Sequence, residues 1–177
     1  SEDPYKSALK IKDELEKNKI KNVEIYEQPE IGELIGTHYE VVVGSDTVCF
    51  IYQPIACHSY NAVKIEDKVV KIATIDTMLS FYLAFTYADR DYYDKERIIC
   101  MAQYLFEVQE KNRLEQKGLL KRFSVHCYGK QETIEEIRGN KNKIFHQLKN
   151  NPRSKIFEEY FLRYIPADKT KRKKPRK

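Results

Sequence analysis

The sequence predicts an α+β fold in which a small, mostly antiparallel sheet precedes a cluster of helices. Short stretches rich in β-branched and aromatic residues fill the chain up to Ala73, and helical periodicity follows. The two patterns meet at residues 70–85, where a strand passes through Thr74 into a run that is apolar on every side. A helix that is hydrophobic all round belongs inside a protein, so we expect this helix at the centre of the domain.

The first half of the chain predicts one helix followed by strands. Asp3 and Pro4 form a typical helix opening, a capping side chain before a proline at the first helical position. The helix is expected to reach about Lys19, with an apolar side formed by Tyr5, Ala8, Ile11 and Leu15. Later residues predict a strand at 23–25, a hairpin of strands 38–43 and 48–52 with a four-residue loop, and a second hairpin of 62–65 and 68–73.

Two helices are expected next. Thr74 is suited to cap the first, and Asp76 lies in its first turn, where a negative charge favours the helix dipole. A long helix is expected from about residue 92 to residue 117, with Asp89-Arg90-Asp91 capping its start and Gly118 ending it. Its apolar stripe comprises Ile98, Met101, Ala102, Leu105, Phe106 and Val108.

The last two helices have their own boundary signals. Thr133 and Glu136 form a capping box that opens a helix reaching about Lys149. Asn151-Pro152 separates it from a final helix near residues 154–164. The inner face of the final helix is expected to hold Ile156, Phe157, Tyr160 and Phe161. We expect residues 1–168 to form a single α+β domain and residues 169–177 to form a basic disordered tail.

The positive charge of the chain is concentrated in this tail. The formal net charge is +5, and residues 169–177 hold seven of the 32 Lys and Arg residues. The remaining 25 basic residues face 27 acidic ones, so the body of the protein is slightly acidic. A basic run of this kind favours binding to nucleic-acid phosphates without sequence preference. A disordered terminus without a dedicated partner is the alternative.

The four cysteines, Cys49, Cys57, Cys100 and Cys127, are widely spaced, and a chain of this size does not need disulfide bonds to fold. We therefore expect reduced thiols. The pairs Cys57-His58 and His126-Cys127 suggest zinc, but adjacent ligands lack the usual spacer of structural zinc sites, so we expect no metal. No apolar run of about eighteen residues and no basic–apolar leader is present, so we expect no membrane span and no secretion signal.

Cations and aromatic residues gather around the predicted end of the long helix, with Phe123 and Tyr128 among them. Lys and Arg side chains can hold phosphates while a ring stacks on a base, a sequence-tolerant mode of binding single strands. A helix C-terminus also favours cations through its dipole, which is the alternative explanation. The RNA-binding candidates are Lys111, Arg113, Lys117, Lys121, Arg122, Lys130, Arg138, Lys171, Arg172, Lys173 and Lys174.

Five longer segments, residues 71–88, 97–113, 116–123, 127–133 and 160–166, resemble a known family. They are similar to the poly(A) polymerase catalytic subunits of large cytoplasmic DNA viruses. The resemblance implies that this chain, which starts at Ser1 without Met, is the C-terminal part of a longer polymerase. It also implies a fold that resembles a degenerate second copy of the nucleotidyltransferase domain.

In that family two carboxylates alternate on a strand after a Gly-Ser turn and hold two Mg²⁺ ions. Gly44-Ser45 resembles the turn, but the strand expected at 48–52 has no acid. Asp89 and Asp91 have the one-residue spacing, but they lie between two predicted helices. We therefore expect no catalytic residue in this segment, and a nuclease site built from scattered Asp, Glu and Lys stays open as an alternative.

The resemblance implies a parent enzyme that is a template-independent polynucleotide adenylyltransferase. It would add AMP from ATP to mRNA 3′ ends with Mg²⁺ or Mn²⁺, and this segment itself would bind none of these cofactors. The expected partners are RNA, the catalytic domain of the same polypeptide, and a second copy or a processivity subunit, in the virion and host cytoplasm. The segment is expected to help bind RNA and to support the catalytic domain or the dimer. A stand-alone RNA-binding or scaffold module is the alternative.

Overall fold

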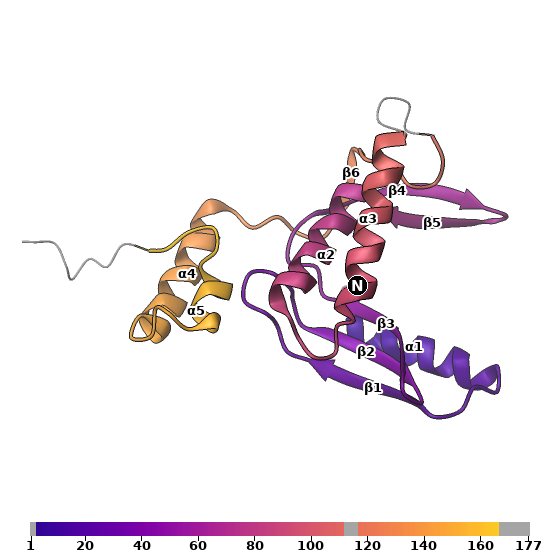
Figure 1. Ribbon diagram of the computed structural model, residues 1–177, viewed down its shortest axis with the longest axis horizontal. Coiled ribbons are helices and arrows are strands. Elements are labelled where there is room, and N and C mark those ends of the chain that lie inside the picture. The colour runs from indigo at the N-terminus through magenta and orange to yellow at the C-terminus, as the bar shows by residue number, and fades with distance from the viewer. Residues whose placement is uncertain (1–2, 112–116, 167–177) are drawn as a thin grey trace, which may run out of the picture. The chain divides into compact units, whose positions relative to one another are not determined.

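The computed structural model describes residues 3–111 and 117–166, and the α+β class is confirmed within them (Figure 1). The chain divides into two compact units, Ser1–Gln131 and Glu132–Lys177, which are described separately. The single domain expected over residues 1–168 stays a prediction. The basic tail at 169–177 lies outside the described residues.

The first unit begins with a helix on a three-stranded antiparallel sheet of strand order β1-β2-β3. Its elements are α1 (Pro4–Lys17), β1 (Val23–Gln28), β2 (His38–Val43) and β3 (Asp46–Tyr52). Asp3 caps α1, because its Oδ1 accepts the backbone N–H of Lys6 at 2.9 Å, as expected. α1 packs on one face of the sheet, where Ala8, Val23 and Val41 form a buried core (Figure 1).

The hairpin of β2 and β3 is tighter than the sequence suggested. Val43 pairs with Asp46, so the loop has two residues, Gly44 and Ser45, and the expected four-residue loop is wrong. Gly44 has φ +63°. A positive φ at the first loop position is what a type II′ turn requires, and this turn matches the twist of the strands.

The opposite face of this sheet is covered by aromatic rings from the corner between α2 (Ile75–Ala88) and α3 (Lys95–Lys111). His38 is 0% exposed at its centre, with Tyr52 stacked on it at 4.9 Å. Its Nδ1–H donates to the Gly36 carbonyl at 3.1 Å, and its Nε2 accepts the Tyr93 hydroxyl at 3.2 Å. Burial lowers the pKa of His38 and raises that of Tyr93, so both stay neutral. The aromatic cluster joins the sheet to the helices.

A second antiparallel sheet, of strand order β5-β4-β6, lies in the same unit. β4 (His58–Ile65) and β5 (Lys68–Ala73) form the hairpin expected across Glu66-Asp67, with Glu66 at φ +53°. β6 (His126–Tyr128) adds to the other edge of β4, and the sequence did not predict it. Three residues are too few to show an alternating pattern, which explains the omission.

The two central helices lie side by side (Figure 1). Thr74 caps α2 and Asp76 lies in its first turn, as expected. The expectation that α2 is buried all round is wrong, because Leu83 and Tyr87 are 59% and 46% exposed. Phe106, expected in the apolar stripe of α3, is also exposed, whereas Ile98 and Leu105 of that stripe are buried.

The boundaries of α3 differ from those expected. The helix starts at Lys95 rather than near residue 92, because the corner residues before it pack against the first sheet. Its last described residue is Lys111, and the expected continuation through residues 112–116 lies outside the described residues. Gly118 has φ +82°, a conformation in which no helix continues.

The second unit contains α4 (Ile134–Leu148) and α5 (Lys155–Tyr160). The capping box is confirmed: the Thr133 N–H donates to Glu136 Oε2 at 2.8 Å, and the Glu136 N–H donates to Thr133 Oγ1 at 3.2 Å. α5 ends at Tyr160, four residues before the expected end. The rings of Phe145, Phe157 and Phe161 pack together, whereas Ile156 is exposed and does not belong to the inner face.

Candidate nucleic-acid interface

The second sheet carries three aromatic rings and a cation on one face. Tyr60 of β4 lies directly opposite His126 of β6, and their rings stack at 6.0 Å. Lys71 of β5 lies on the same face, because it pairs with Ala62, two residues after Tyr60. Its Nζ lies 4.9 Å from the ring centroid of Tyr60 and 5.5 Å from that of Tyr128. We call Tyr60, Lys71, His126 and Tyr128 the aromatic–cation face.

The members of this face are within reach of solvent. Lys71 and His126 are exposed, and Tyr60 and Tyr128 are half-buried. A Lys ammonium over two rings fixes their orientation and keeps a positive charge beside them. In proteins that bind single-stranded nucleic acids, flat rings stack on the bases while neighbouring cations contact the phosphates.

The segment after α3 places a second cation–aromatic pair in the same unit. The Ile75 N–H donates to the Lys121 carbonyl at 2.9 Å, and Asn61 Nδ2 donates to the Phe123 carbonyl at 3.3 Å. The next residue, Ser124, donates its hydroxyl to the Tyr60 carbonyl. Between these anchors Arg122 Cζ lies 4.9 Å from the Phe123 ring, which is 55% exposed. The segment is thus fastened to α2 and to β4.

A polar cavity of about 320 Å³ lies beside this segment, at the start of α2. Several of its hydroxyl groups are used within the protein, whereas His58 Nε2 and Arg122 Nε are buried without a hydrogen-bond partner among the described residues. Thr77 Oγ1 donates to the Ser59 carbonyl at 3.2 Å, and Ser80 Oγ donates to the Thr77 carbonyl at 2.7 Å. Arg122 Nε lies 3.7 Å from Asp76 Oδ2. Asp76 and the Phe123 ring position Arg122 at this cavity, and the surface formed by the exposed rings is the better candidate for binding.

The structure places Lys121, Arg122 and Lys130 near this surface. Arg122 and Lys121 belong to the anchored segment, and Lys130 lines a shallow cavity of about 430 Å³ together with Tyr128. Lys111 is the last residue of α3, and Lys117 is exposed in the segment that follows.

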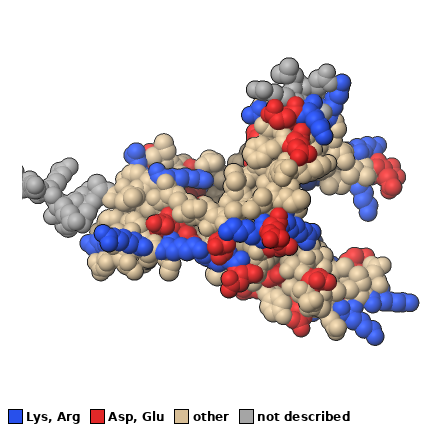
Figure 2. All heavy atoms as spheres, in the orientation of Figure 1, with Lys and Arg blue, Asp and Glu red and all other residues tan. Residues whose placement is uncertain are grey.

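The remaining candidates are not brought together with these residues. Arg138 lies on α4 in the second unit. Arg113, Lys171, Arg172, Lys173 and Lys174 lie outside the described residues. On the face shown in Figure 2, Lys and Arg lie among Asp and Glu within each unit.

Three members of the aromatic–cation face, Tyr60, Lys71 and His126, were missed as binding residues. Strand alternation in the expected hairpin could have placed Lys71 on one face with Ala62, and an extension of that strand would have added Tyr60. His126 joins them only through β6, for which the sequence holds no clear signal.

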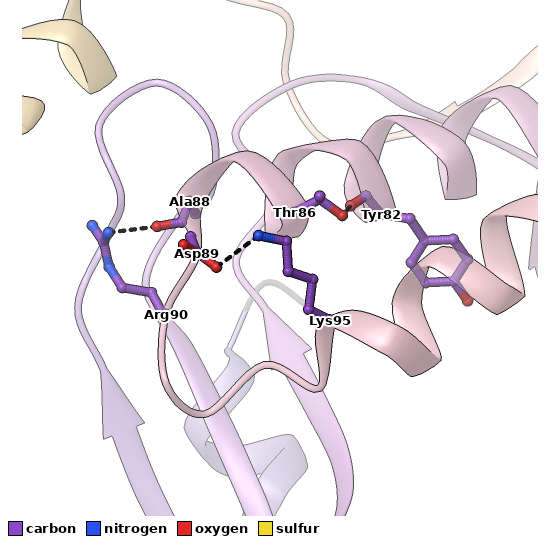
Figure 3. A network of polar contacts seen from close by, with 6 residues as sticks. All are labelled: Tyr82, Thr86, Ala88, Asp89, Arg90 and Lys95. Carbon is purple, nitrogen blue, oxygen red and sulfur yellow. Dashed lines mark hydrogen bonds and ion pairs between the residues drawn. The ribbon is translucent and has the colours of Figure 1, made fainter.

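The Asp89-Arg90-Asp91 motif terminates a helix and does not start one. Asp89 adopts φ +50° at the C-terminal end of α2, and its Oδ1 lies 3.3 Å from Lys95 Nζ (Figure 3). Arg90 Nη1 donates to the Ala88 carbonyl at 2.8 Å. The start of α3 is capped by Asp94, whose Oδ1 accepts the Arg97 N–H at 3.0 Å. The expectation that the motif caps the long helix is therefore wrong.

Cys57 and Cys127 form a disulfide, so the expectation that all cysteines are reduced is wrong for this pair. Pairing of β4 with β6 brings their Cα atoms to 5.3 Å, a normal disulfide separation, although 70 residues separate them in sequence. Cys49 and Cys100 are free thiols. Among the described residues, no three His, Cys, Asp or Glu side chains gather closely enough to hold a metal ion.

Within residues 3–111 and 117–166, no helix combines the length and the apolar character that a membrane crossing needs. No protein-family model, curated protein or solved structure matches this chain.

Proposed function

We propose that this chain binds single-stranded RNA without catalysing a reaction, and that the aromatic–cation face is its binding surface. The observation that supports this proposal best is the position of Lys71, whose ammonium lies over the rings of both Tyr60 and Tyr128 on one sheet face. The Arg122–Phe123 pair, anchored to the Tyr60 carbonyl through Ser124, adds a second ring with a cation.

The chemistry of these groups favours single strands over duplexes. Bases of a single strand are free to stack on tyrosine, histidine and phenylalanine rings, each worth about 1–3 kcal/mol. Lysine and arginine contact the phosphates and make the affinity salt-dependent. Because every base has a flat face, the binding tolerates different sequences. This tolerance suits a protein that holds mRNA 3′ ends, whose sequences differ.

The parent protein in this proposal is a template-independent poly(A) polymerase of a large cytoplasmic DNA virus. What supports it is the resemblance of the five segments between residues 71 and 166. In this proposal the segment is a degenerate nucleotidyltransferase fold that supports the catalytic domain or a dimer, while ATP and Mg²⁺ or Mn²⁺ bind upstream. The parent would act in the virion and host cytoplasm.

The parent can be tested apart from RNA binding. The reading frame upstream of Ser1 is expected to encode a Gly-Ser turn followed by Asp-x-Asp on a strand. The isolated chain is expected not to extend an RNA primer with ATP and Mg²⁺ or Mn²⁺. A reading frame without these motifs would reject the polymerase parent and favour a stand-alone RNA-binding module.

Fluorescence anisotropy with labelled oligo(U) and oligo(A) of about 15 nucleotides, a length set by typical single-strand sites, tests the binding surface. Tyr128→Leu is expected to weaken binding about 5- to 150-fold, the equivalent of one lost stacking ring. Lys71→Gln is expected to weaken binding and to make the salt slope shallower by about 0.7, the value for one phosphate contact.

Lys10→Gln on the exposed side of α1 is the matched control for Lys71→Gln and should leave affinity almost unchanged. Deletion of residues 169–177 should weaken binding further through lost phosphate contacts. If Tyr128→Leu and Lys71→Gln bind RNA as the unaltered chain does, the aromatic–cation face is not the binding surface.

A further inference from the structure

The strand β6 supplies half of the aromatic–cation face but has little backbone pairing of its own. It has three residues, and two of them, His126 and Tyr128, carry rings of the face. Among the described strands it pairs with β4 alone, through three residue pairs. The middle residue, Cys127, is bonded to Cys57, which immediately precedes β4. Because side chains alternate along a strand, the covalent bond ties β6 to the start of β4 from the face opposite to these rings.

Besides the disulfide, the three residue pairs with β4, the ring contacts of the face and the hydrogen bonds of Ser124 keep β6 in place. The Ser124 hydroxyl donates to the Tyr60 carbonyl and accepts the His126 N–H at 3.1 Å. By contrast, β4 and β5 share six residue pairs and a tight turn, and they do not depend on the disulfide. Loss of the bond is thus expected to free β6 while the rest of the sheet persists, because short edge elements open at low cost.

We propose that the Cys57–Cys127 disulfide is a redox switch for RNA binding: oxidised, it holds His126 and Tyr128 against Tyr60 and Lys71, and reduced, it releases them. This inference rests on the proposed function, whose binding surface it would regulate. Cys127 is an exposed residue of the edge strand β6, and exposed disulfides are the ones that thiols reduce readily.

The reductant in this proposal is a dithiol, either a small molecule or a dithiol protein. One of its thiolates attacks Cys127 Sγ, the S–S bond breaks, and Cys57 leaves as a thiolate that takes up a proton. The second thiol of the reductant then displaces Cys127, which also becomes a thiol. Two electrons and two protons pass to the protein, and the dithiol becomes a disulfide. An oxidised dithiol reverses the sequence.

The test uses the full chain with Cys49→Ser and Cys100→Ser, so that only the bonded pair responds to redox conditions. Oligo(U) affinity and hydrogen–deuterium exchange are measured before and after treatment with dithiothreitol. Reduction is expected to weaken binding at least about fivefold, the effect of losing one stacked ring. Exchange should increase at residues 124–130 and stay unchanged at residues 38–43 of β2.

The variant with Cys57→Ser and Cys127→Ser in addition serves as the permanently reduced control. It should bind as the reduced chain does and should not respond to dithiothreitol. Equal RNA affinity in both redox states, or equal exchange at residues 124–130, would overturn the switch. An oxidised chain that binds no RNA would instead reject the proposed function, while the exchange data would still decide whether reduction frees β6.

Discussion

The hydrogen bond between Tyr93 and His38 can be tested by a single-atom change. Tyr93→Phe keeps the ring, which stacks on Phe85 at 4.8 Å, and removes only the hydroxyl that donates to His38 Nε2. Because His38 is fully buried and its Nδ1–H is already used by Gly36, Nε2 would be left without a donor. Such an orphaned group costs about 1–3 kcal/mol of unfolding free energy.

The assay is urea unfolding followed by circular dichroism at neutral pH. The midpoint should fall while the m-value stays constant, since the surface exposed on unfolding does not change. Tyr87→Phe, which removes a hydroxyl from a 46% exposed ring, is the matched control and should change stability by less than about 0.5 kcal/mol. A Tyr93→Phe chain as stable as this control would refute the argument that the bond stabilises the fold.

Three further outcomes are expected. Burial lowers the pKa of His38 and of His58 in the folded state, so the unfolded state binds more protons as the pH drops below about 6.5. The urea midpoint should therefore fall below this pH, and a constant midpoint down to about pH 5 would contradict the argument. Thr133→Ala should destabilise α4 by about 1 kcal/mol and speed amide exchange in its first turn, and unchanged exchange would contradict the capping box. Gly129→Ala should destabilise the first unit, because its φ is +107° and the new Cβ would lie 2.2 Å from the Ala56 carbonyl oxygen. Gly139 lies in α4 with open space around it, so Gly139→Ala should stabilise this helix by about 0.5–1 kcal/mol. A change of stability in the same direction for Gly129→Ala and Gly139→Ala would contradict the argument from backbone geometry.

Local signals predicted the starts of α1, α2 and α4 correctly. The caps at Asp3, Thr74 and Thr133 depend on a side chain and backbone groups two or three residues away, so the sequence contains the whole interaction. The hairpin around Glu66 is local in the same way. The exposure of Leu83 was not predictable, because it depends on which elements cover each side of α2.

The candidate site was only partly predictable because it is assembled from distant segments. Arg122 and Tyr128 were found from their cationic and aromatic neighbours in sequence. Lys71 lies in a strand about fifty residues before Arg122, and from the sequence it was predicted only as part of a hairpin. Its position over two rings depends on the pairing of β4 with β6, which the sequence alone does not reveal. The Cys57–Cys127 bond was missed for the same reason.

The two sheets of the first unit differ in the sequence separation between their strands, and this separation affects the order in which the sheets fold. β1, β2 and β3 follow one another within residues 23–52, so they can pair as soon as they are synthesised. β4 has its β5 neighbour at once but must wait for β6, which is made only after both central helices. The edge that carries the aromatic–cation face would therefore be the last part of this unit to form. Until then β4 would have an unpaired edge during synthesis, open to wrong strand partners.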